Sequence, residues 1–129
     1  MTSEATSAGV AAPFLAGLHA RSIVYQRCMA CGRAQTLAHY ACTTCGSPAL
    51  TWQIASGQGR VYATTTIARA PSEDYAALVP YTLALVDMEE GFRLLGHAAP
   101  EVAITDDVIA GFFEHAGRTL LWFTHPIVA

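Results

Sequence analysis

The sequence predicts a mainly β protein with a short N-terminal helix, a small cysteine-bearing ribbon and a closed barrel of five strands. Three observations predict this fold class. Two CxxC motifs stand close together within residues 28–45, short β-favouring runs separated by Pro and Gly fill the chain after residue 60, and no long helical pattern occurs. At 129 residues the chain has the usual size of one domain, so we expect one principal core with one small appendage.

A short helix is expected over residues 13–21. It begins with proline, which suits the first turn of a helix because the missing N–H has no partner there. Phe14, Leu15 and Leu18 fall on one side at helical spacing, so this side is expected to pack on an apolar surface. We assign residues 1–23 to an N-terminal helical segment.

The cysteines of the chain form two CxxC motifs, each followed by glycine: Cys28, Cys31, Cys42 and Cys45. Disulfides are disfavoured in a reducing compartment, and they bridge a two-residue gap only with difficulty. A redox CxxC stands at the head of a helix in a βαβ unit, which glycine-containing turns fit poorly. A zinc site fits best, because a CxxC turn brings two sulfurs onto one ion and the following Gly32 or Gly46 can take the positive φ of a tight knuckle.

Four thiolates fill the tetrahedral shell of Zn²⁺ and leave no position for an activated water, so we expect one structural zinc ion per chain. The ten residues between Cys31 and Cys42 are enough to run out and back as a short hairpin. We assign residues 24–54 to this zinc ribbon, which has little apolar core of its own and is expected to unfold first when the metal is removed. His39 lies inside the hairpin and is expected to be a surface imidazole, since the thiolates complete the shell.

Five β-favouring runs follow the ribbon, at residues 60–70, 81–89, 91–99, 101–115 and 119–125. The first run alternates from Val61 to Ile67, as expected of a strand with one buried face. The second and third runs are joined by a tight hairpin, with Gly91 at the position that needs positive φ. We assign residues 55–129 to the barrel domain.

The amino-acid composition limits the kinds of molecule that the protein is expected to bind. Hydrophobic residues make up 53% of the chain, charged residues only 13%, and mean hydropathy is +0.33, so part of the apolar surface is expected to be covered by another protein. The net charge is -3 and all seven basic residues are scattered arginines, which disfavours nucleic acid as the partner. No apolar run is long enough to span a membrane, and the N-terminus lacks the basic start of a signal peptide, so we expect a cytoplasmic protein.

No motif for catalysis by the chain alone is present. GxSxG and HExxH are absent and the cysteines are assigned to metal, so we expect no catalytic residue in this chain. The five histidines are His19, His39, His97, His115 and His125. Each stands singly beside apolar or exposed segments, so a structural or solvated imidazole is expected. Glu89 and Glu90 fall in the expected hairpin turn, where a hydrated acidic pair is expected.

Several motifs together carry a family resemblance: FLAGL near the N-terminus, CMACG and CTTCGS in the ribbon, then LTWQIASGQGRVYATTTI, PYTLALVDMEEGFRLLGH and the closing LLWFTHP. With these motifs the sequence resembles the DUF35 family, whose members combine a rubredoxin-like zinc ribbon with an OB-fold barrel. The resemblance spans Phe14 to Pro126. The sequence departs from the family pattern at ITDDV, where Asp106 and Asp107 stand in place of the family's Ile-Gly step before the fourth strand.

This resemblance implies a non-catalytic accessory subunit. DUF35 proteins are partners of thiolase-fold enzymes, and sometimes of hydratases, that act on acyl-coenzyme A thioesters. The OB domain is implied to form a wall of the acyl-CoA channel and to stabilise the larger subunit, which carries the catalytic Cys and His. The reaction is then Claisen-type thiolysis, retro-aldol cleavage or acyl transfer, and a heterotetramer is expected if the partner is a twofold dimer.

Residues that contact the substrate remain open at this point. Arg60, Arg69 or Arg93 can fork onto coenzyme A phosphates, although an ordinary solvated arginine is favoured for any one of them. A nucleic-acid-binding zinc-ribbon protein is the main alternative, since OB folds also bind single strands. Its only candidate stacking platform is Tyr62 with Tyr81, and no lysine accompanies it. An independent thioesterase or redox enzyme is disfavoured by the missing nucleophile and base.

Overall fold

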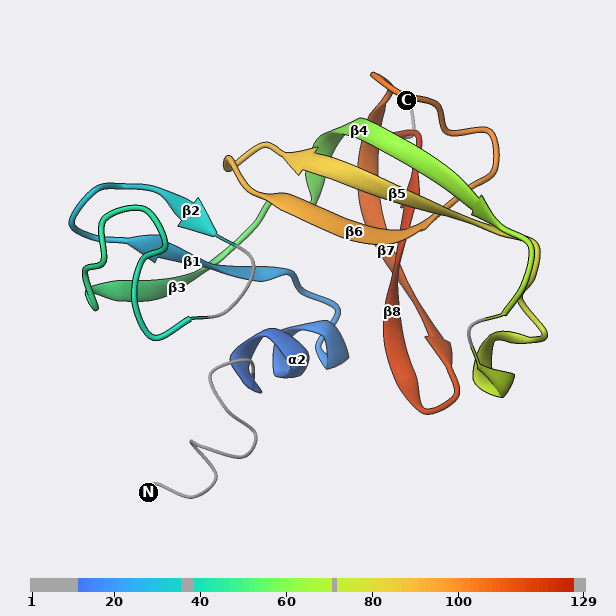
Figure 1. Ribbon diagram of the computed structural model, residues 1–129, viewed down its shortest axis with the longest axis horizontal. Coiled ribbons are helices and arrows are strands. Elements are labelled where there is room, and N and C mark those ends of the chain that lie inside the picture. The colour runs from blue at the N-terminus through green and yellow to red at the C-terminus, as the bar shows by residue number, and fades with distance from the viewer. Residues whose placement is uncertain (1–11, 36–38, 71, 127–129) are drawn as a thin grey trace.

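The computed structural model describes residues 12–35, 39–70 and 72–126. A small three-stranded sheet lies at one end and a closed five-stranded barrel at the other, with the helix packed below them (Figure 1). The molecule is mainly β, as predicted. Among the described residues, no helix has the length and apolar character needed to cross a membrane.

Helix α2 (Ala12–His19) is shorter than expected, because the chain leaves the helical conformation at Arg21, where φ is 60°. Phe14 and Leu18 pack against the buried core, as their spacing predicts. Leu15 was expected on the same side, but it is 54% exposed, so that prediction is wrong. The helix contacts strands of both the ribbon and the barrel.

The ribbon is an antiparallel sheet in the order β2-β1-β3. Strand β1 (Val24–Cys28) lies in the centre, β3 (Leu50–Ile54) pairs along its whole length, and β2 (Ala34–Gln35) is a two-residue edge. The expected hairpin between the two cysteine motifs therefore takes a different form. Its first part pairs with β1 and not with its own return, while residues 36–38 lie outside the described part of the chain.

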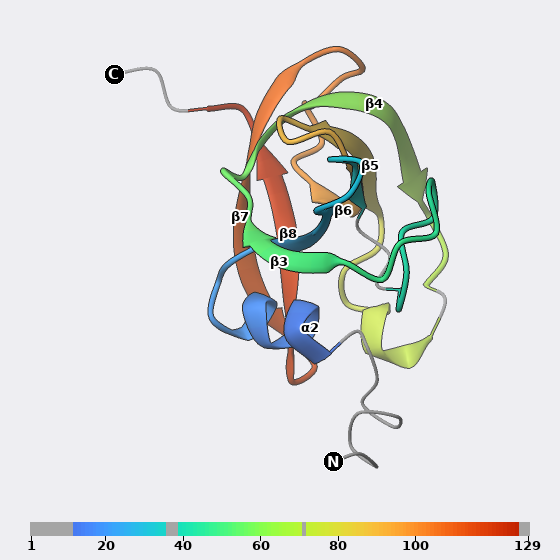
Figure 2. The same ribbon diagram turned by 90° about the vertical axis from the view of Figure 1, so that its left-hand side faces the viewer.

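The barrel contains five strands: β4 (Gln58–Ile67), β5 (Tyr81–Met88), β6 (Arg93–Ala98), β7 (Asp107–His115) and β8 (Arg118–Thr124). Their order is β4-β5-β6-β8-β7, and β7 pairs with β4 to close the sheet (Figure 2). Only β6 and β8 run parallel; the other pairs are antiparallel. This arrangement confirms the predicted five-stranded OB-fold.

The fourth strand begins later than the sequence pattern indicated. Residues 101–106 form a turn and not a strand, because Asp106 accepts the backbone N–H of Ala103 over 3.0 Å and Thr105 has φ 76°. Between β4 and β5, a short 3₁₀ helix η1 (Glu73–Tyr75) lies beside the barrel, where Tyr75 contacts rings of β6 and β7.

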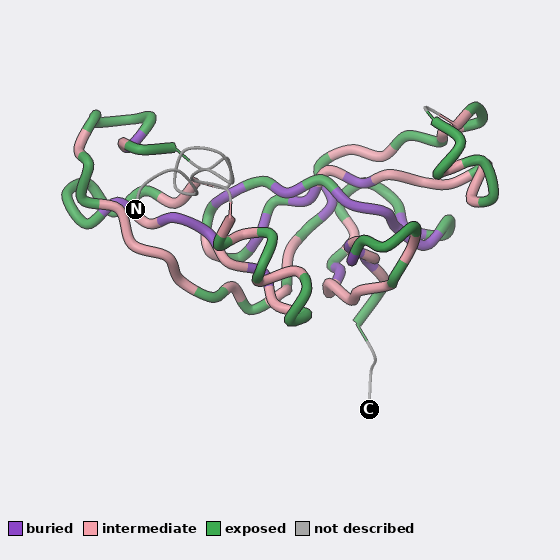
Figure 3. The backbone as a smooth tube through the Cα atoms, turned by 90° about the horizontal axis from the view of Figure 1, so that it is seen from below, coloured by how far each residue is buried: buried purple, intermediate pink, exposed green. Residues whose placement is uncertain are grey.

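A single buried cluster runs through the barrel and into the ribbon. Val86, Val108 and Phe123 are among its fully buried members, and Ile23 and Tyr25, which precede and open the ribbon, belong to the same cluster. Figure 3 shows the buried stretches concentrated in the middle of the molecule and the exposed ones at its tips. The ribbon therefore packs on the barrel through the base of β1, and its cysteine-bearing end projects away from it.

Candidate metal centre

Two turns of nearly identical geometry carry the four cysteines. In the first, Gly32 has φ 82° and its N–H donates to the Cys28 carbonyl over 2.8 Å. In the second, Gly46 has φ 80° and its N–H donates to the Cys42 carbonyl over 2.9 Å. Positive φ is free of steric cost for glycine. The glycine after each CxxC therefore closes its turn, as the sequence predicted.

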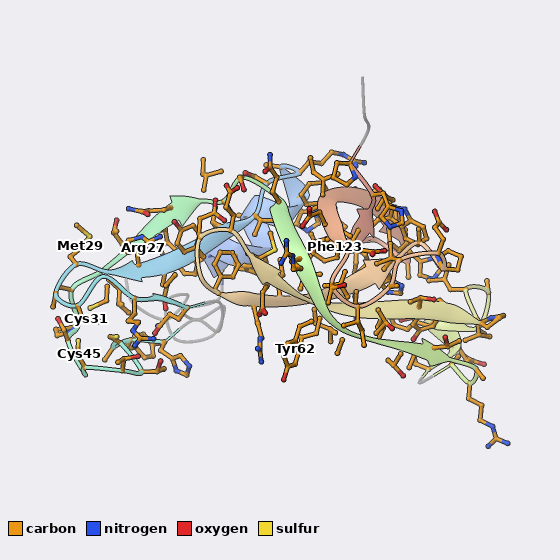
Figure 4. All side chains as sticks on the ribbon, turned by 90° about the horizontal axis from the view of Figure 1, so that it is seen from above. Arg27, Met29, Cys31, Cys45, Tyr62 and Phe123 are labelled. Atoms are coloured by element: carbon orange, nitrogen blue, oxygen red, sulfur yellow. The ribbon has the colours of Figure 1, made fainter. Side chains whose placement is uncertain are left out.

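These turns face each other and bring the four sulfurs together. Cys28 Sγ lies 3.6 Å from Cys45 Sγ, Cys31 Sγ lies 3.7 Å from Cys42 Sγ, and all four ligand atoms lie within 4.8 Å of one another. A zinc ion with Zn–S bonds of about 2.3 Å places its tetrahedral sulfurs about 3.8 Å apart, whereas a disulfide needs about 2.05 Å. The donor set and spacing fit zinc. Figure 4 shows Cys31 and Cys45 at the end of the ribbon remote from the barrel.

Backbone amides donate hydrogen bonds to the sulfurs of Cys28 and Cys42. The Cys31 N–H donates to Cys28 Sγ over 3.4 Å, and the Thr44 N–H donates to Cys42 Sγ over 3.3 Å. Such donors favour a thiolate over a thiol. The pKa of Cys28 is lowered, chiefly by the Cys31 amide, and the pKa of Cys42 is lowered to about 6 by the amides of Cys45 and Thr44. Metal binding needs thiolates, so the environment of Cys28 and Cys42 favours it. Although the Ser47 amide lowers the pKa of Cys45, hydrogen bonds with the other cysteines and burial together outweigh this lowering and raise the pKa to about 11.

A buried glutamine that the sequence analysis missed holds the loop between the turns. Gln26 is 2% exposed. Its Nε2 donates to the His39 carbonyl over 2.9 Å, while its Oε1 accepts the His39 N–H over 3.0 Å and Gln35 Nε2 over 2.7 Å. The backbone of His39 is therefore fixed by Gln26. Its side chain is exposed, and the potential metal-ligand group found in the described residues consists of the cysteines alone.

Arg27 of β1 joins the first cysteine turn to the barrel. Its Nη1 donates to the Gly32 carbonyl over 2.7 Å, and its Nε donates to Gln53 Oε1 over 3.0 Å. Its Nη2 donates to the Tyr25 hydroxyl over 2.9 Å and reaches the Glu90 carbonyl, in the β5–β6 hairpin, at 3.5 Å. One guanidinium thus links three segments that are far apart in the sequence.

Two further contacts join the ribbon to the barrel near Arg27. The rings of Tyr25 and Phe92 stack with centroids 4.7 Å apart, and Glu90 Oε2 accepts the Ser56 N–H over 2.7 Å. The other carboxylate oxygen of Glu90 is buried and has no hydrogen-bond partner among the described residues. The expectation of a hydrated acidic pair is therefore wrong for Glu90, which is part of the ribbon–barrel contact.

Comparisons with known proteins agree with this architecture. The family model for the ChsH2 rubredoxin-like zinc ribbon domain matches residues 16–51, and that for the ChsH2 C-terminal OB-fold domain matches residues 52–104. A solved structure described as an Ltp2-ChsH2(DUF35) aldolase is 29% identical with a TM-score of 0.78, over 91% of this chain and 94% of that one. The chain belongs to the DUF35 family. A DUF35 protein of unknown function from Sulfolobus solfataricus is 20% identical with a TM-score of 0.64, over 91% and 85% of the two chains, and shows likeness of fold alone.

In this DUF35 chain, two of the three arginines considered for coenzyme A contact already have carboxylate partners. Arg60 Nε lies 3.3 Å from Asp107 Oδ1, and Arg93 Nε lies 2.5 Å from Asp87 Oδ1. Arg69 is exposed and has no ion pair with another described residue. Of the three, Arg69 is therefore the one without a carboxylate partner among the described residues.

The two tyrosines considered as a stacking platform do not form one. Strand pairing places Tyr81 opposite Ile67, five residues along β4 from Tyr62. The Tyr62 ring is half-exposed and is covered by the Arg93 guanidinium, 3.6 Å from the ring centroid. Tyr81 instead joins a cluster of rings with Tyr75 and His97.

Two histidines that stand apart in the sequence come together in this DUF35 fold. His97 and His115 both lie against Tyr75, with ring centroids 6.3 Å and 5.7 Å from it, and His115 Nε2 contacts the Asp74 carbonyl. Both imidazoles make structural ring contacts, in line with the expectation of structural or solvated histidines. No local signal in the sequence identifies this pair, because the barrel closure brings β6 and β7 to the same end.

Proposed function

We propose that Cys28, Cys31, Cys42 and Cys45 hold one structural zinc ion per chain. Tetrahedral sulfur spacing and the amide donors around Cys28 and Cys42 support this assignment. Zinc with four thiolate ligands has no open position, so its chemistry here is to stabilise the fold. The ribbon sheet has few buried side chains of its own, and the ion holds its two turns together.

We infer that the chain is a non-catalytic accessory subunit of a thiolase-fold enzyme that acts on acyl-coenzyme A thioesters. One observation carries this proposal: the chain is similar over 91% of its length to 94% of a chain in the solved Ltp2-ChsH2(DUF35) aldolase. The description of that structure pairs a DUF35 protein with Ltp2. A partner of the same class, catalysing thiolysis, retro-aldol cleavage or acyl transfer, is the corresponding proposal for this chain.

The outer face of the barrel supports a protein partner. Ala63, Leu85 and Leu95 are paired across β4, β5 and β6, on the side of the sheet opposite to buried Val86 and Leu94. Leu95 is 57% exposed. The solvent face of an antiparallel sheet is normally polar, so an apolar row across three strands is typical of a covered surface.

The remaining details of the proposal follow from the family. The barrel forms one wall of the acyl-CoA channel, the larger subunit supplies the catalytic Cys and His, and the complex is a cytoplasmic heterotetramer. Arg69 is the candidate contact for coenzyme A phosphates, because Arg60 and Arg93 already have carboxylate partners.

Co-expression with a thiolase-like protein encoded nearby tests the association. The expected result is co-purification through a tag on this chain, with a mass in light scattering that corresponds to two copies of each subunit. A Leu95→Asp variant is expected to weaken the complex, because a charge would be buried without a partner. Thr65→Asp, at another outward position on β4, is the matched control. Separation of the two wild-type proteins during purification would refute the proposal.

A further inference from the structure

A cavity of about 320 Å³ opens on the barrel on the side of the 3₁₀ segment. It is lined by side chains from four strands and two connections, among them Leu78, Tyr81, His97, Pro100, Phe113 and Trp122. The volume falls at the lower end of the range found for small-molecule sites. The cysteine cage does not contribute to it.

His97 is the buried polar side chain of this cavity. It is 8% exposed, and neither ring nitrogen hydrogen-bonds to any other described residue; the ring nitrogens still reach solvent, since the fully enclosed side-chain atom without a partner among the described residues is Glu90 Oε1. Because His97 lines the cavity, a molecule within the cavity can replace solvent as the hydrogen-bond partner of the imidazole.

Aromatic rings surround the imidazole and define the shape of the site. The His97 ring lies 4.8 Å from the Tyr81 ring in a tilted arrangement, and 5.3 Å from the Phe113 ring in an edge-to-face one. Phe113 in turn meets the Trp122 ring edge-on, with centroids 5.9 Å apart. Flat walls at these angles favour a flat ligand, which gains stacking and edge contacts at once.

The cavity carries no fixed charge. Its lining residues include no Asp, Glu, Lys or Arg, and burial lowers the pKa of His97, with a further lowering by nearby His115. The imidazole is therefore neutral at pH 7. A charged ligand would lose its hydration here without gaining a counter-ion.

We propose that this cavity is a binding site for a small, uncharged, flat ring system that carries one hydrogen-bonding oxygen, and that His97 is the residue that pairs with that oxygen. The site goes beyond the accessory-subunit proposal, because it lies within the chain itself and needs no partner. Tyr81, Phe113 and Trp122 provide the apolar contacts.

Three related probes separate the parts of this proposal. They are p-cresol, which has a ring and a hydroxyl; toluene, which lacks the hydroxyl; and p-toluate, which carries a charge. The full-length, zinc-loaded chain is titrated with each, in a Trp52→Phe background that leaves Trp122 as the sole indole reporter. Saturable quenching by p-cresol is expected, with toluene about tenfold weaker and p-toluate without effect.

Substitutions then test whether His97 makes the hydrogen bond to the hydroxyl of p-cresol. His97→Phe keeps an aromatic side chain and removes the nitrogen, so p-cresol and toluene are expected to bind equally. His39→Phe, the same change at an exposed ribbon position, is expected to keep the tenfold preference. Phe113→Leu is expected to weaken both probes alike. Circular dichroism of each variant confirms that the barrel is folded.

Three results would overturn the proposal. One is the absence of saturable quenching by p-cresol in the folded wild-type chain. Another is a preference for p-cresol that survives in a folded His97→Phe variant. The third is loss of p-cresol binding in the complex with the catalytic subunit, which would identify the cavity as a protein contact. The first two leave the accessory-subunit proposal untouched, because the titration uses the chain alone.

Discussion

Tyr25 of the zinc ribbon stacks on Phe92 of the barrel, with ring centroids 4.7 Å apart and an angle of 23° between the ring planes. Both side chains are buried, at 3% and 5% exposure. The Tyr25 hydroxyl also donates to Gln53 Oε1 and accepts from Arg27 Nη2. The ribbon is therefore joined to the barrel by a buried contact and not by a flexible linker.

Truncating this contact is expected to destabilise the whole chain. Tyr25→Ala removes a buried ring and is expected to lower the free energy of unfolding by about 3–5 kcal/mol, whereas Tyr25→Phe loses only the hydroxyl bonds and costs about 1 kcal/mol. Tyr40 is 70% exposed in the same ribbon, so Tyr40→Ala is the matched control, with an effect below about 0.5 kcal/mol. Urea denaturation measures all three variants. Equal effects of Tyr25→Ala and Tyr40→Ala would contradict the role of the stack.

Removing one cysteine tests the metal centre. Cys42→Ser is expected to bind less than one zinc per chain by elemental analysis, because a neutral hydroxyl replaces a thiolate ligand. Met29 lies in the first turn and is 64% exposed, so Met29→Leu is expected to retain one zinc. Chelation of the wild type is expected to change Trp52 emission, in the ribbon, before Trp122 emission, in the barrel. A full zinc content in Cys42→Ser would contradict the assignment.

Gly96 tests the packing of the barrel core. A Cβ atom at this position would lie 2.8 Å from Leu121 Cβ and 2.9 Å from Phe123 Cε2. Gly96→Ala is therefore expected to cost about 1–3 kcal/mol through overpacking. At Gly111, on β7 of the same barrel, the nearest atom to an added Cβ is the Trp122 carbonyl oxygen at 3.4 Å, so Gly111→Ala is expected to change stability by less than about 1 kcal/mol. Thermal denaturation of the pair checks the order.

The stability that the Asp106 carboxylate gives to the turn before β7 is expected to depend on pH. Its Oδ2 lies 2.7 Å from His125 Nε2 and accepts the Ala103 N–H, and these contacts, His125 first, lower the pKa of Asp106 below its ordinary 3.8. The ionised carboxylate therefore stabilises the fold above about pH 4, and this contribution is lost as the pH falls through the folded-state pKa. Asp106→Asn is expected to be less stable than the wild type at pH 6, and the difference is expected to shrink as the pH falls below 3.8 towards the folded-state pKa. Exposed Glu101→Gln is the control, and a constant difference across the pH range would contradict the mechanism.

The features that the sequence predicted are those encoded within short segments. The cysteine cage follows from two CxxC-Gly turns, each closed by its own glycine, so spacing alone was sufficient for Gly32 and Gly46. The barrel strands followed from alternation and from turn residues such as Gly91. The helix was located, but Leu15 was placed on the wrong side because helical spacing does not reveal where the packing surface ends.

The junction between ribbon and barrel was not predicted, because it joins residues that are distant in the sequence. Arg27 and Glu90 are separated by 63 positions, and nothing in the hairpin turn that contains Glu90 indicates a contact with the ribbon. The same reason applies to His97 and His115, which meet only when β6 and β7 reach the same end of the closed sheet. Gln26 carries no such signal either, because it stands beside Arg27 in the strand VYQRC, and its contact with the His39 backbone depends on the fold of the loop.

The activity and stability of the catalytic partner test the central claim most directly. The partner is purified with and without this chain, and its turnover of an acyl-coenzyme A thioester and its thermal unfolding midpoint are measured side by side. We predict that the partner alone is less stable and less active, and that adding the zinc-loaded chain restores both. A partner that is equally stable and equally active without this chain would contradict the accessory-subunit account.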